Sequence, residues 1–437
     1  MGKKIWLHLK RIDKFWKKII INFLIDINMK KINIGIIGGG LSGLIVAKEL
    51  YKNLGDNVNI TIIEKEREIG GRIFSKKFNG CPIELGAQFF IDGEHVHHLI
   101  KTLNLRDDII SLKDKFISFR YNNKIFTIDE ISSPDFLGKN GKTEKDKLLD
   151  YANNLEINKD LISQSFRKWY KKNINGNLIS FWNRLLISIG VKDVDSINAY
   201  FGLILINVFF GSNYLLKDGL GKLVNNLLKE LKTFNPNIIT NSKCININKK
   251  YGKFLIEIDK KRGLLFDKII SAIKPEDLSE IFKRKNIILL DKIEGYPMAL
   301  YVVESDKKLW DKTWGLIICE EKSPIYAICD WKNVTDAKAD TPILIICSPF
   351  ANKNEIISEL GRLFIDLNPQ FKIIYEKKWD VGLHQLNGEI IKIRKKINME
   401  MPEGLYLAGD WMAIPALEGA VISGKKAAKS LIIKNCQ

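Results

Sequence analysis

The sequence predicts an α/β fold, and three neighbouring features predict it together. An apolar run ends at Ile37, a glycine-rich turn follows it, and a second apolar run ends at Glu64. The turn over residues 38–43 reads Gly-Gly-Gly-Leu-Ser-Gly and contains the pattern Gly-x-Gly-x-x-Gly. A strand, a tight turn, a helix, a second strand and an acidic residue in this order form the βαβ unit that binds dinucleotides.

The three glycines of the pattern have separate roles. Gly38 permits the tight turn, Gly40 lets the backbone approach a pyrophosphate, and Gly43 lets the helix pack closely on the strand. A glycine-rich turn without a ligand is the alternative interpretation. The ordered strands, the helix and the acidic residue favour the nucleotide site.

The start of the following helix supplies the rest of the phosphate loop. We expect the backbone of Gly39, Leu41 and Ser42 to present free N–H groups to the phosphates, at the positive end of the helix dipole. Glu64 would hold the hydroxyl pair of a ribose. The first part of the chain therefore predicts a bound dinucleotide.

Four later blocks identify a family. Residues 70–75 read GGRIFS and residues 83–90 read IELGAQFF. Near the C-terminal end, residues 405–411 read LYLAGDW and residues 417–428 read LEGAVISGKKAA. Together with the glycine turn, these blocks resemble the flavin-containing amine oxidase superfamily, which includes monoamine and polyamine oxidases, protoporphyrinogen oxidase and carotenoid desaturases. They lie in the family's order over residues 31–433, and they imply FAD rather than a nicotinamide cofactor.

The resemblance also implies which residues contact the flavin nucleotide. Gly71 lets the main chain pass near the flavin, and Arg72 can neutralise the charge of the pyrophosphate or of the flavin. Asp410 can accept hydrogen bonds from the ribityl chain or lie near the pyrophosphate. The helix that starts near Glu418 can direct its N–H groups at the flavin. The complete set implied is Gly38, Gly39, Gly40, Leu41, Ser42, Gly43, Glu64, Gly71, Arg72, Gly86, Ala87, Gln88, Cys244, Gly409, Asp410, Glu418 and Ala420. Because no cysteine lies at the family's covalent position, we expect FAD to be bound non-covalently.

The predicted architecture is α/β, with a Rossmann-like FAD-binding domain that is discontinuous in sequence and a mixed α+β substrate domain. The FAD-binding domain is expected over residues 29–105, 212–285 and 396–437. The substrate domain is expected over residues 106–211 and 286–395. Strands expected near residues 296–304, 315–319, 325–330 and 343–347 suggest a mixed sheet above the flavin. The aromatic residues between positions 166 and 210 either line a pocket or form ordinary core.

Composition favours a cytoplasmic enzyme. The chain has 437 residues, of which 46% are hydrophobic, and its net charge is +18. No apolar run reaches the length of a membrane span. The six cysteines are scattered without a C-x-x-C pair, which is typical of buried thiols in a reducing compartment. We find no nucleic-acid-binding motif, so we expect a small-molecule substrate and no nucleic acid.

Residues 1–28 form a basic extension with amphipathic helical spacing. Apolar residues such as Trp6, Leu9 and Trp16 recur at that spacing, with lysines on the remaining face. Three interpretations stay open: an upstream extension without a structural role, a helix lying on an anionic membrane surface, and an organelle transit segment. The membrane interpretation adds peripheral membrane contact to the expected cytoplasmic location.

The substrate is not identified by the sequence. In many family amine oxidases a lysine precedes a tryptophan on one strand, but residues 298–303 before Trp310 contain no lysine. Gln88 and Phe89 follow the segment that should pass the ring, and His384 replaces a proline of the family segment after Trp379. His384 is either a proton donor in the pocket or a structural histidine. These three residues are the catalytic candidates.

Two classes of function are consistent with these features. The first is an FAD-dependent oxidoreductase that passes a hydride equivalent from a substrate C–H bond to flavin N5, oxidising C–N or C–C bonds, with reoxidation by oxygen or another acceptor. The substrate would be small, and apolar or aromatic. The second is a flavin-binding protein without turnover that acts as a redox or interaction module. His95, His97 and His98 are expected on a solvated helix face, without a metal site. The oligomeric state is left open.

Overall fold

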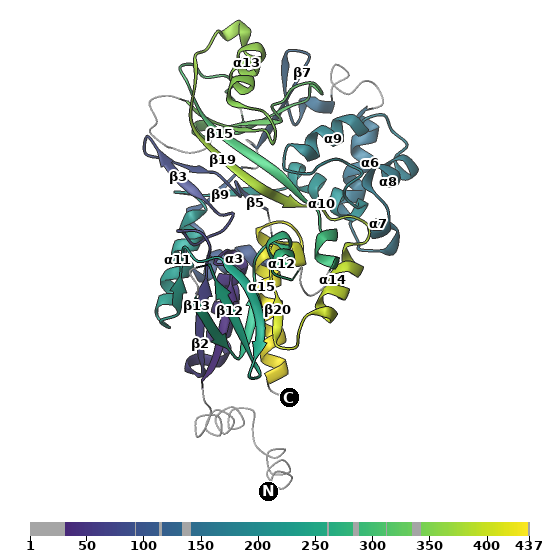
Figure 1. Ribbon diagram of the computed structural model, residues 1–437. Helices are drawn as coiled ribbons and strands as arrows, with labels where there is room; N and C mark the ends of the chain where they lie inside the picture. The colour runs from purple at the N-terminus through teal and green to yellow at the C-terminus, as the bar shows by residue number, and fades with distance from the viewer. Residues whose placement is uncertain are drawn as a thin grey trace.

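The computed structural model describes residues 31–91, 93–112, 116–132, 141–259, 262–282, 288–311, 313–333 and 342–435. It has the predicted α/β fold, with a parallel sheet in the lower half of Figure 1 and a larger mixed sheet in the upper half. The amphipathic segment 1–28 lies outside the described residues, so its three interpretations stay predictions. Within the described residues, no helix combines the length and apolar character needed to cross a bilayer.

The lower sheet contains five strands, and each of its neighbouring pairs runs parallel. Its order is β10 (Asn237–Ile239), β2 (Val58–Ile63), β1 (Ile32–Ile37), β14 (Lys268–Ser271) and β20 (Leu405–Leu407). Because the strands are parallel, their carboxyl ends lie at one edge of the sheet. In such sheets, ligands bind at that edge. Segments that are far apart in sequence therefore meet there.

Both faces of the lower sheet are covered, as parallel sheets require. Helices α3 (Leu41–Leu54) and α15 (Leu417–Asn435) pack side by side on one face. A three-stranded antiparallel sheet covers the other face, where the ring of Phe266 packs against Gly35 of β1. Its strands are β11 (Cys244–Lys250), β12 (Lys253–Ile258) and β13 (Arg262–Phe266). Strands β11 and β12 form an antiparallel pair.

The upper sheet contains seven strands and is mixed. The order is β19-β15-β18-β17-β16-β7-β8, and the pair β16–β7 is parallel while the other pairs are antiparallel. The strands are β7 (Ile117–Tyr121), β8 (Lys124–Thr127), β15 (Gly295–Ser305), β16 (Gly315–Ile318), β17 (Ala327–Asp330), β18 (Ile343–Cys347) and β19 (Phe371–His384). The four predicted strands are therefore present, and their ends differ from the predicted ends by at most two residues.

A group of helices packs beside the upper sheet (Figure 1). They are α6 (Gly141–Asn153), α7 (Lys159–Ser163), α8 (Phe166–Asn173), α9 (Ile179–Ile187) and α10 (Ala199–Phe210). Trp169, Tyr170 and Trp182 are among the largest fully buried side chains. Most of the aromatic residues of this segment therefore form core, as the second interpretation held.

Shorter elements connect the two halves. They are β3 (Ser75–Phe78), β4 (Cys81–Glu84), β5 (Phe90–Ile91), α4 (Glu94–Thr102), β6 (Ile109–Ser111), β9 (Asn213–Leu216), α11 (Gly221–Lys232), α12 (Pro275–Phe282), α13 (Lys353–Leu363) and α14 (Ile390–Glu400). Pro275 begins α12, where its missing N–H leaves no helical hydrogen bond unmade. All five described cysteines are free thiols, and four of them are buried. The sixth, Cys436, lies outside the described residues.

Candidate active site

A cavity of about 660 Å³ lies at the carboxyl edge of the lower sheet. Four of its lining residues follow the ends of four parallel strands, namely Gly38, Glu64, Ala272 and Gly409. Its walls continue upward to β15, β18 and β19 of the upper sheet and to α10. The cavity therefore joins the predicted nucleotide loop to the underside of the mixed sheet.

The glycine turn has the backbone that the pattern predicts. Gly38 has a φ of 103°, which favours glycine. A Cβ atom on Gly43 would lie 2.1 Å from the carbonyl oxygen of Gly38, so a side chain there would force the helix away from the turn. At Gly40 the nearest described atom to such a Cβ is the Cα of Gly71, at 3.8 Å. Gly40 thus faces open space in the cavity, whereas Gly43 faces backbone.

The Glu64 carboxylate is held firmly at the end of β2. It is buried, one oxygen accepts a hydrogen bond of 2.7 Å from the N–H of Gly39, and the other accepts one of 2.9 Å from the N–H of Glu66. A carboxylate offers about four lone-pair positions, so roughly two remain for another donor. The group is in position to accept hydrogen bonds from a ribose. Cys244, which begins β11, lines the same end of the cavity.

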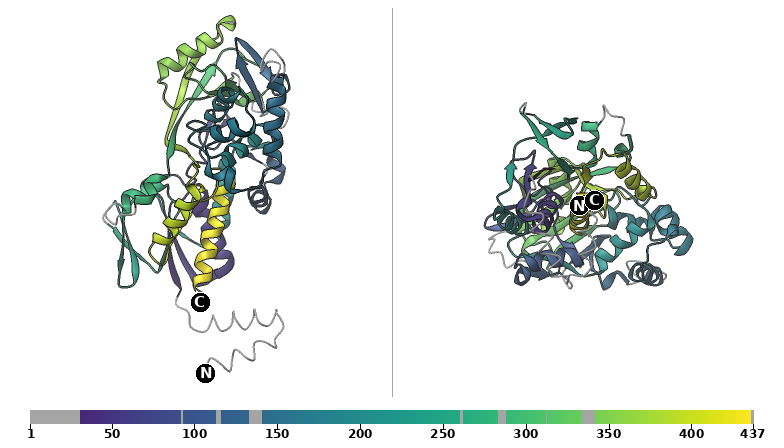
Figure 2. Two further views of the ribbon diagram at one scale, coloured as in Figure 1. Left: turned by 90° about the vertical axis from the view of Figure 1, so that its right-hand side faces the viewer. Right: turned by 90° about the horizontal axis from the view of Figure 1, so that it is seen from below.

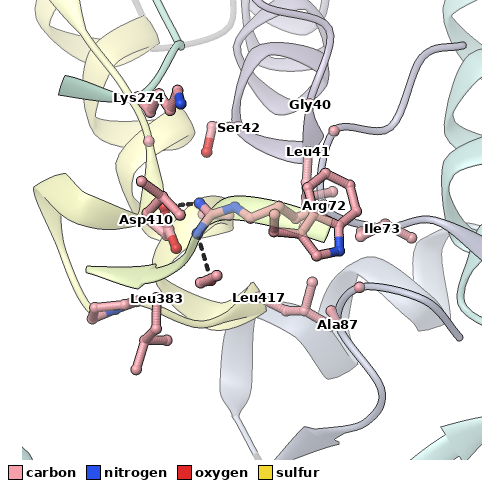
Figure 3. A pocket seen from close by; sticks show the side chains of 18 of the residues that line it. Gly40, Leu41, Ser42, Arg72, Ile73, Ala87, Lys274, Leu383, Asp410 and Leu417 are labelled. Atoms are coloured by element: carbon pink, nitrogen blue, oxygen red, sulfur yellow. Dashed lines mark hydrogen bonds and ion pairs between the residues drawn. The ribbon is translucent and has the colours of Figure 1, made fainter. Parts of the chain in front are cut away.

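Arg72 reaches across the cavity to Asp410 (Figure 3). Its guanidinium also donates a 3.1 Å hydrogen bond to the carbonyl of Gly382. Asp410, just after Gly409, accepts a further hydrogen bond from the N–H of Trp411. The two residues expected to face the flavin nucleotide thus form an ion pair with each other. This pair lies beside Ser42 and Leu41 in the same cavity.

The segment around Gly86 passes tightly between Arg72 and the upper sheet. A Cβ atom on Gly86 would lie 2.0 Å from the carbonyl oxygen of Arg72, and the N–H of Ala87 donates to that oxygen. The amide of Gln88 lies between the sulfurs of Cys329 and Cys347, at 3.7 and 3.9 Å. The upper sheet therefore fixes the Gln88 side chain.

Phe89 takes part in an aromatic cluster at the cavity wall. Its ring makes edge-to-face contacts with Phe116 and Trp314, with ring centroids 5.0 and 6.0 Å apart. This geometry is favourable for aromatic pairs. Phe89 therefore shapes the cavity and carries no proton-transfer group.

Glu418 has a partner that the sequence did not suggest. Its carboxylate accepts hydrogen bonds of 2.9 and 2.8 Å from the N–H groups of His95 and Val96, in the first turn of α4. The carboxylate therefore stabilises the start of α4, while the start of α15, with Leu417 and Ala420, lines the cavity. His95 contacts Lys425 through Nδ1. Among the described residues no group of His, Cys, Asp and Glu side chains has a metal-ligand arrangement.

His384 is fully buried at the end of β19 and lines the cavity. Its Nε2 lies 3.3 Å from the Glu276 carboxylate, and its Nδ1 has no hydrogen-bond partner among the described residues. Burial raises the pKa of Glu276, but the hydrogen bond and charge of His384, a backbone hydrogen bond and the charge of Lys274 together lower the pKa below its ordinary value. The Nδ1 atom is therefore a buried polar atom without a partner among the described residues.

The strand expected to lack a lysine does lack one. Met298 and Leu300 are the β15 residues that line the cavity. The neighbouring strand β19, however, contributes Lys377, which lies directly opposite Leu300. Sequence reasoning missed Lys377 because the pairing of β15 with β19 joins segments that are more than 70 residues apart.

The upper end of the cavity is apolar. Four residues of α10 line it together with Met298 and Leu300 of β15, namely Phe201, Ile204, Leu205 and Val208. Their spacing of three or four residues places them on one face of the helix. Among the aromatic residues of positions 166–210, Phe201 is thus the one that is buried in the core and also lines the cavity.

The comparisons with known proteins identify the family. The model of the family described as flavin containing amine oxidoreductase matches residues 41–432. The chain belongs to this family. The family is one of flavin-containing oxidoreductases, in agreement with the resemblance found in the sequence.

Curated relatives match over short segments. Coproporphyrinogen III oxidase of Mycobacterium bovis is 38% identical over 56 residues, which are 13% of this chain and 12% of the relative. Polyamine oxidase 1 of Oryza sativa is 36% identical over 58 residues, 13% of this chain and 11% of the relative. The aligned part of the chain therefore spans only about an eighth of these relatives.

Solved structures match over nearly the whole chain at low identity. A candidate protoporphyrinogen oxidase from Exiguobacterium sp. 255-15 has a TM-score of 0.76 at 15% identity, covering 93% of this chain and all of the other. Putrescine oxidase with bound putrescine has a TM-score of 0.70 at 15% identity, covering 92% and 99%. A fatty acid isomerase from P. acnes has a TM-score of 0.70 at 14% identity, also covering 92% and 99%. These similarities show the shared fold.

The residues of the cavity fit an FAD molecule. Gly40 leaves space where a pyrophosphate must approach the backbone, and Glu64 has free acceptor positions at the end of β2. Arg72 supplies a positive charge between the nucleotide loop and the upper sheet. An elongated dinucleotide can therefore extend from β2 to the underside of β15.

Proposed function

We propose that the chain oxidises a C–H bond of an apolar small molecule, at a C–N or a C–C bond, with reoxidation by oxygen or another acceptor. The observation that carries the proposal is the continuous cavity, which begins at the nucleotide loop and ends in an apolar chamber between α10 and β15. Bound FAD supplies the acceptor of the hydride equivalent at N5. The residues of this chain bind and orient the cofactor and the substrate, and they exclude water.

We propose that the cofactor is held non-covalently by the residues derived above from the sequence. Gly38 to Gly43 form the phosphate loop, and Glu64 receives the ribose hydroxyls. Gly71, Arg72, Gly409 and Asp410 surround the middle of the cofactor. Gly86, Ala87 and Gln88 form the wall next to the ring, while Cys244 and the start of α15 at Glu418 and Ala420 close the two ends. All of these except Gly39 and Gly43 line the cavity.

The domain division that we propose follows the predicted boundaries, with the FAD-binding domain over 29–105, 212–285 and 396–437. The five strands of the lower sheet all come from these segments, which supports the division. The residues of 106–211 and 286–395 supply the helices and the sheet that enclose the chamber. The chamber therefore lies between the two domains.

Substrate orientation in the chamber depends on shape and exclusion of water. Phe201 and Leu205 on α10 and Leu300 on β15 present hydrocarbon to a substrate, and burying such surface contributes roughly 25 cal/mol per Å². His384 is the one catalytic candidate with a titratable group at the cavity, and we propose that its unpartnered Nδ1 exchanges a proton with the substrate or orients it.

The experiment is anaerobic reduction of the purified flavoprotein. The protein is expected to be yellow, to release FAD on acid precipitation, and to lose its flavin absorbance with a substrate from a panel of amines, amino acids and isoprenoids. A colourless protein that gains no flavin absorbance with added FAD would disprove the cofactor site. If dithionite bleaches the flavin but no compound of the panel does, the result would favour the flavin-binding module without turnover.

A further inference from the structure

Lys377 occupies a defined position in the wall of the cavity. On the upper sheet, Lys377 of β19 pairs with Leu300 of β15, and Leu300 pairs with Cys347 of β18. Directly opposed residues of adjacent strands point to the same face of a sheet, with Cβ atoms about 5 Å apart. All three residues line the cavity. The lysine is therefore the outer member of a row whose next two members are apolar.

The ammonium group of Lys377 is held without a counter-ion. It lies 4.3 Å from the ring centroid of Trp379 and 4.9 Å from that of Phe74, which fixes it by cation–π contacts. Within the described part of the chain, no carboxylate lies within ion-pair distance of it. Two other lysines of the cavity wall, Lys65 and Lys274, each form an ion pair with Asp277.

Three acidic residues of the cavity wall are engaged elsewhere. Glu64 accepts from two backbone N–H groups, Asp410 pairs with Arg72, and Glu418 holds the start of α4. The residues that line the chamber from α10 and β15 are apolar. Among the described residues, the chamber is thus lined by hydrocarbon from α10 and β15, and Lys377 brings to its wall a positive charge without a counter-ion.

We propose that the substrate is an amphipathic carboxylate, whose carboxylate binds the Lys377 ammonium and whose apolar body lies against Leu300 and α10. This proposal rests on the proposed function. The carboxylate would supply the missing counter-ion through charge-assisted hydrogen bonds, which are the stronger kind. The partly buried position limits screening by water and salt. A cationic amine would meet repulsion from the same ammonium group.

The test compares three ligands of one chain length, namely dodecanoate, dodecanol and dodecylamine, on the FAD-loaded full-length chain. Binding is read from the perturbation of the flavin absorbance and from equilibrium dialysis. Dodecanoate is expected to bind about tenfold or more tightly than dodecanol, because it gains a charge-assisted interaction, and dodecylamine most weakly. Lys377→Gln is expected to abolish the preference for the acid, and Lys377→Arg to retain it.

Lys372→Gln is the matched control, because Lys372 is an exposed lysine of the same strand outside the cavity wall. It is expected to leave the three affinities unchanged. The proposal would be overturned if the wild type bound dodecanoate and dodecanol equally, or if Lys377→Gln kept the preference for dodecanoate. It would also be overturned if dodecylamine bound most tightly, or if none of the three ligands bound. FAD content, measured on every variant, shows that the nucleotide site is intact. Lys377-dependent binding without flavin bleaching by any substrate would refute the oxidase proposal and leave the carboxylate site standing.

Discussion

Glu84 offers a quantitative test of how the cavity wall is held together. It ends β4, two residues before Gly86, and is 1% exposed. Its carboxylate accepts hydrogen bonds from the N–H of Leu220 and from the Ser75 hydroxyl, the latter 2.7 Å long. The contact with Leu220 ties the strand before the cavity to the loop before α11. Burial raises the pKa of Glu84 to about 7 although both hydrogen bonds lower it.

The sign of the effect on stability follows from this direction. The ordinary value is 4.5, so between pH 4.5 and about 7 the folded protein retains a proton that the unfolded chain has released. The contribution of Glu84 is therefore fully present below pH 4.5 and decreases as the pH rises through about 7. With 1.36 kcal/mol per pKa unit, the two-state expression gives a loss of about 2.5 kcal/mol of unfolding free energy between pH 5 and pH 8.

The perturbation is Glu84→Gln. A glutamine keeps an acceptor for Leu220 and can donate to the Ser75 oxygen, but it does not titrate. The assay is urea unfolding of the FAD-saturated wild type and variant from pH 5 to pH 8. The wild type is expected to lose about 2.5 kcal/mol relative to the variant over this range. A constant difference between the two proteins, or a wild type that gains stability relative to the variant, would refute the reasoning.

Three further results are expected. Gly40→Val should abolish FAD binding, because its side chain enters the cavity, while the apoprotein still unfolds cooperatively. Gly43→Ala should instead unfold the apoprotein, since its Cβ would lie 2.1 Å from the Gly38 oxygen. Equal FAD affinity of Gly40→Val and wild type in a fluorescence titration would contradict the site. Glu64→Ala should weaken FAD binding by roughly 1–3 kcal/mol, measured by the same titration, and an unchanged affinity would exclude the ribose contact. A chain starting at Met29 should retain flavin and turnover but lose co-sedimentation with anionic vesicles. Loss of flavin in this shorter chain would place residues 1–28 within the fold. Equal vesicle binding by the shorter and the full-length chain would exclude a membrane role for residues 1–28.

The sequence by itself was sufficient to predict the glycine turn and the acidic residue of the proposed nucleotide site. Gly38, Gly40, Gly43 and Glu64 are read from a short continuous segment, and their expected roles depend on local backbone geometry, such as the positive φ of Gly38 and the close approach of Gly43 to the Gly38 oxygen. The family and the cofactor followed from motifs that are local in the same sense. Local signals of this kind remain visible because a turn or a helix start is determined by neighbouring residues.

The tertiary structure decided which distant side chains meet. Lys377 reaches Leu300 only through the register of β15 with β19, and a shift of one residue would turn it to the other face of the sheet. The contact of Glu418 with α4 likewise joins residues more than 300 positions apart. Neither partner leaves a mark in the local sequence, because such pairings are selected by the packing of the whole sheet and its covering helices. For this reason the cofactor was predictable from the sequence, whereas the charge and the apolar residues of the upper cavity wall became visible only in the folded chain.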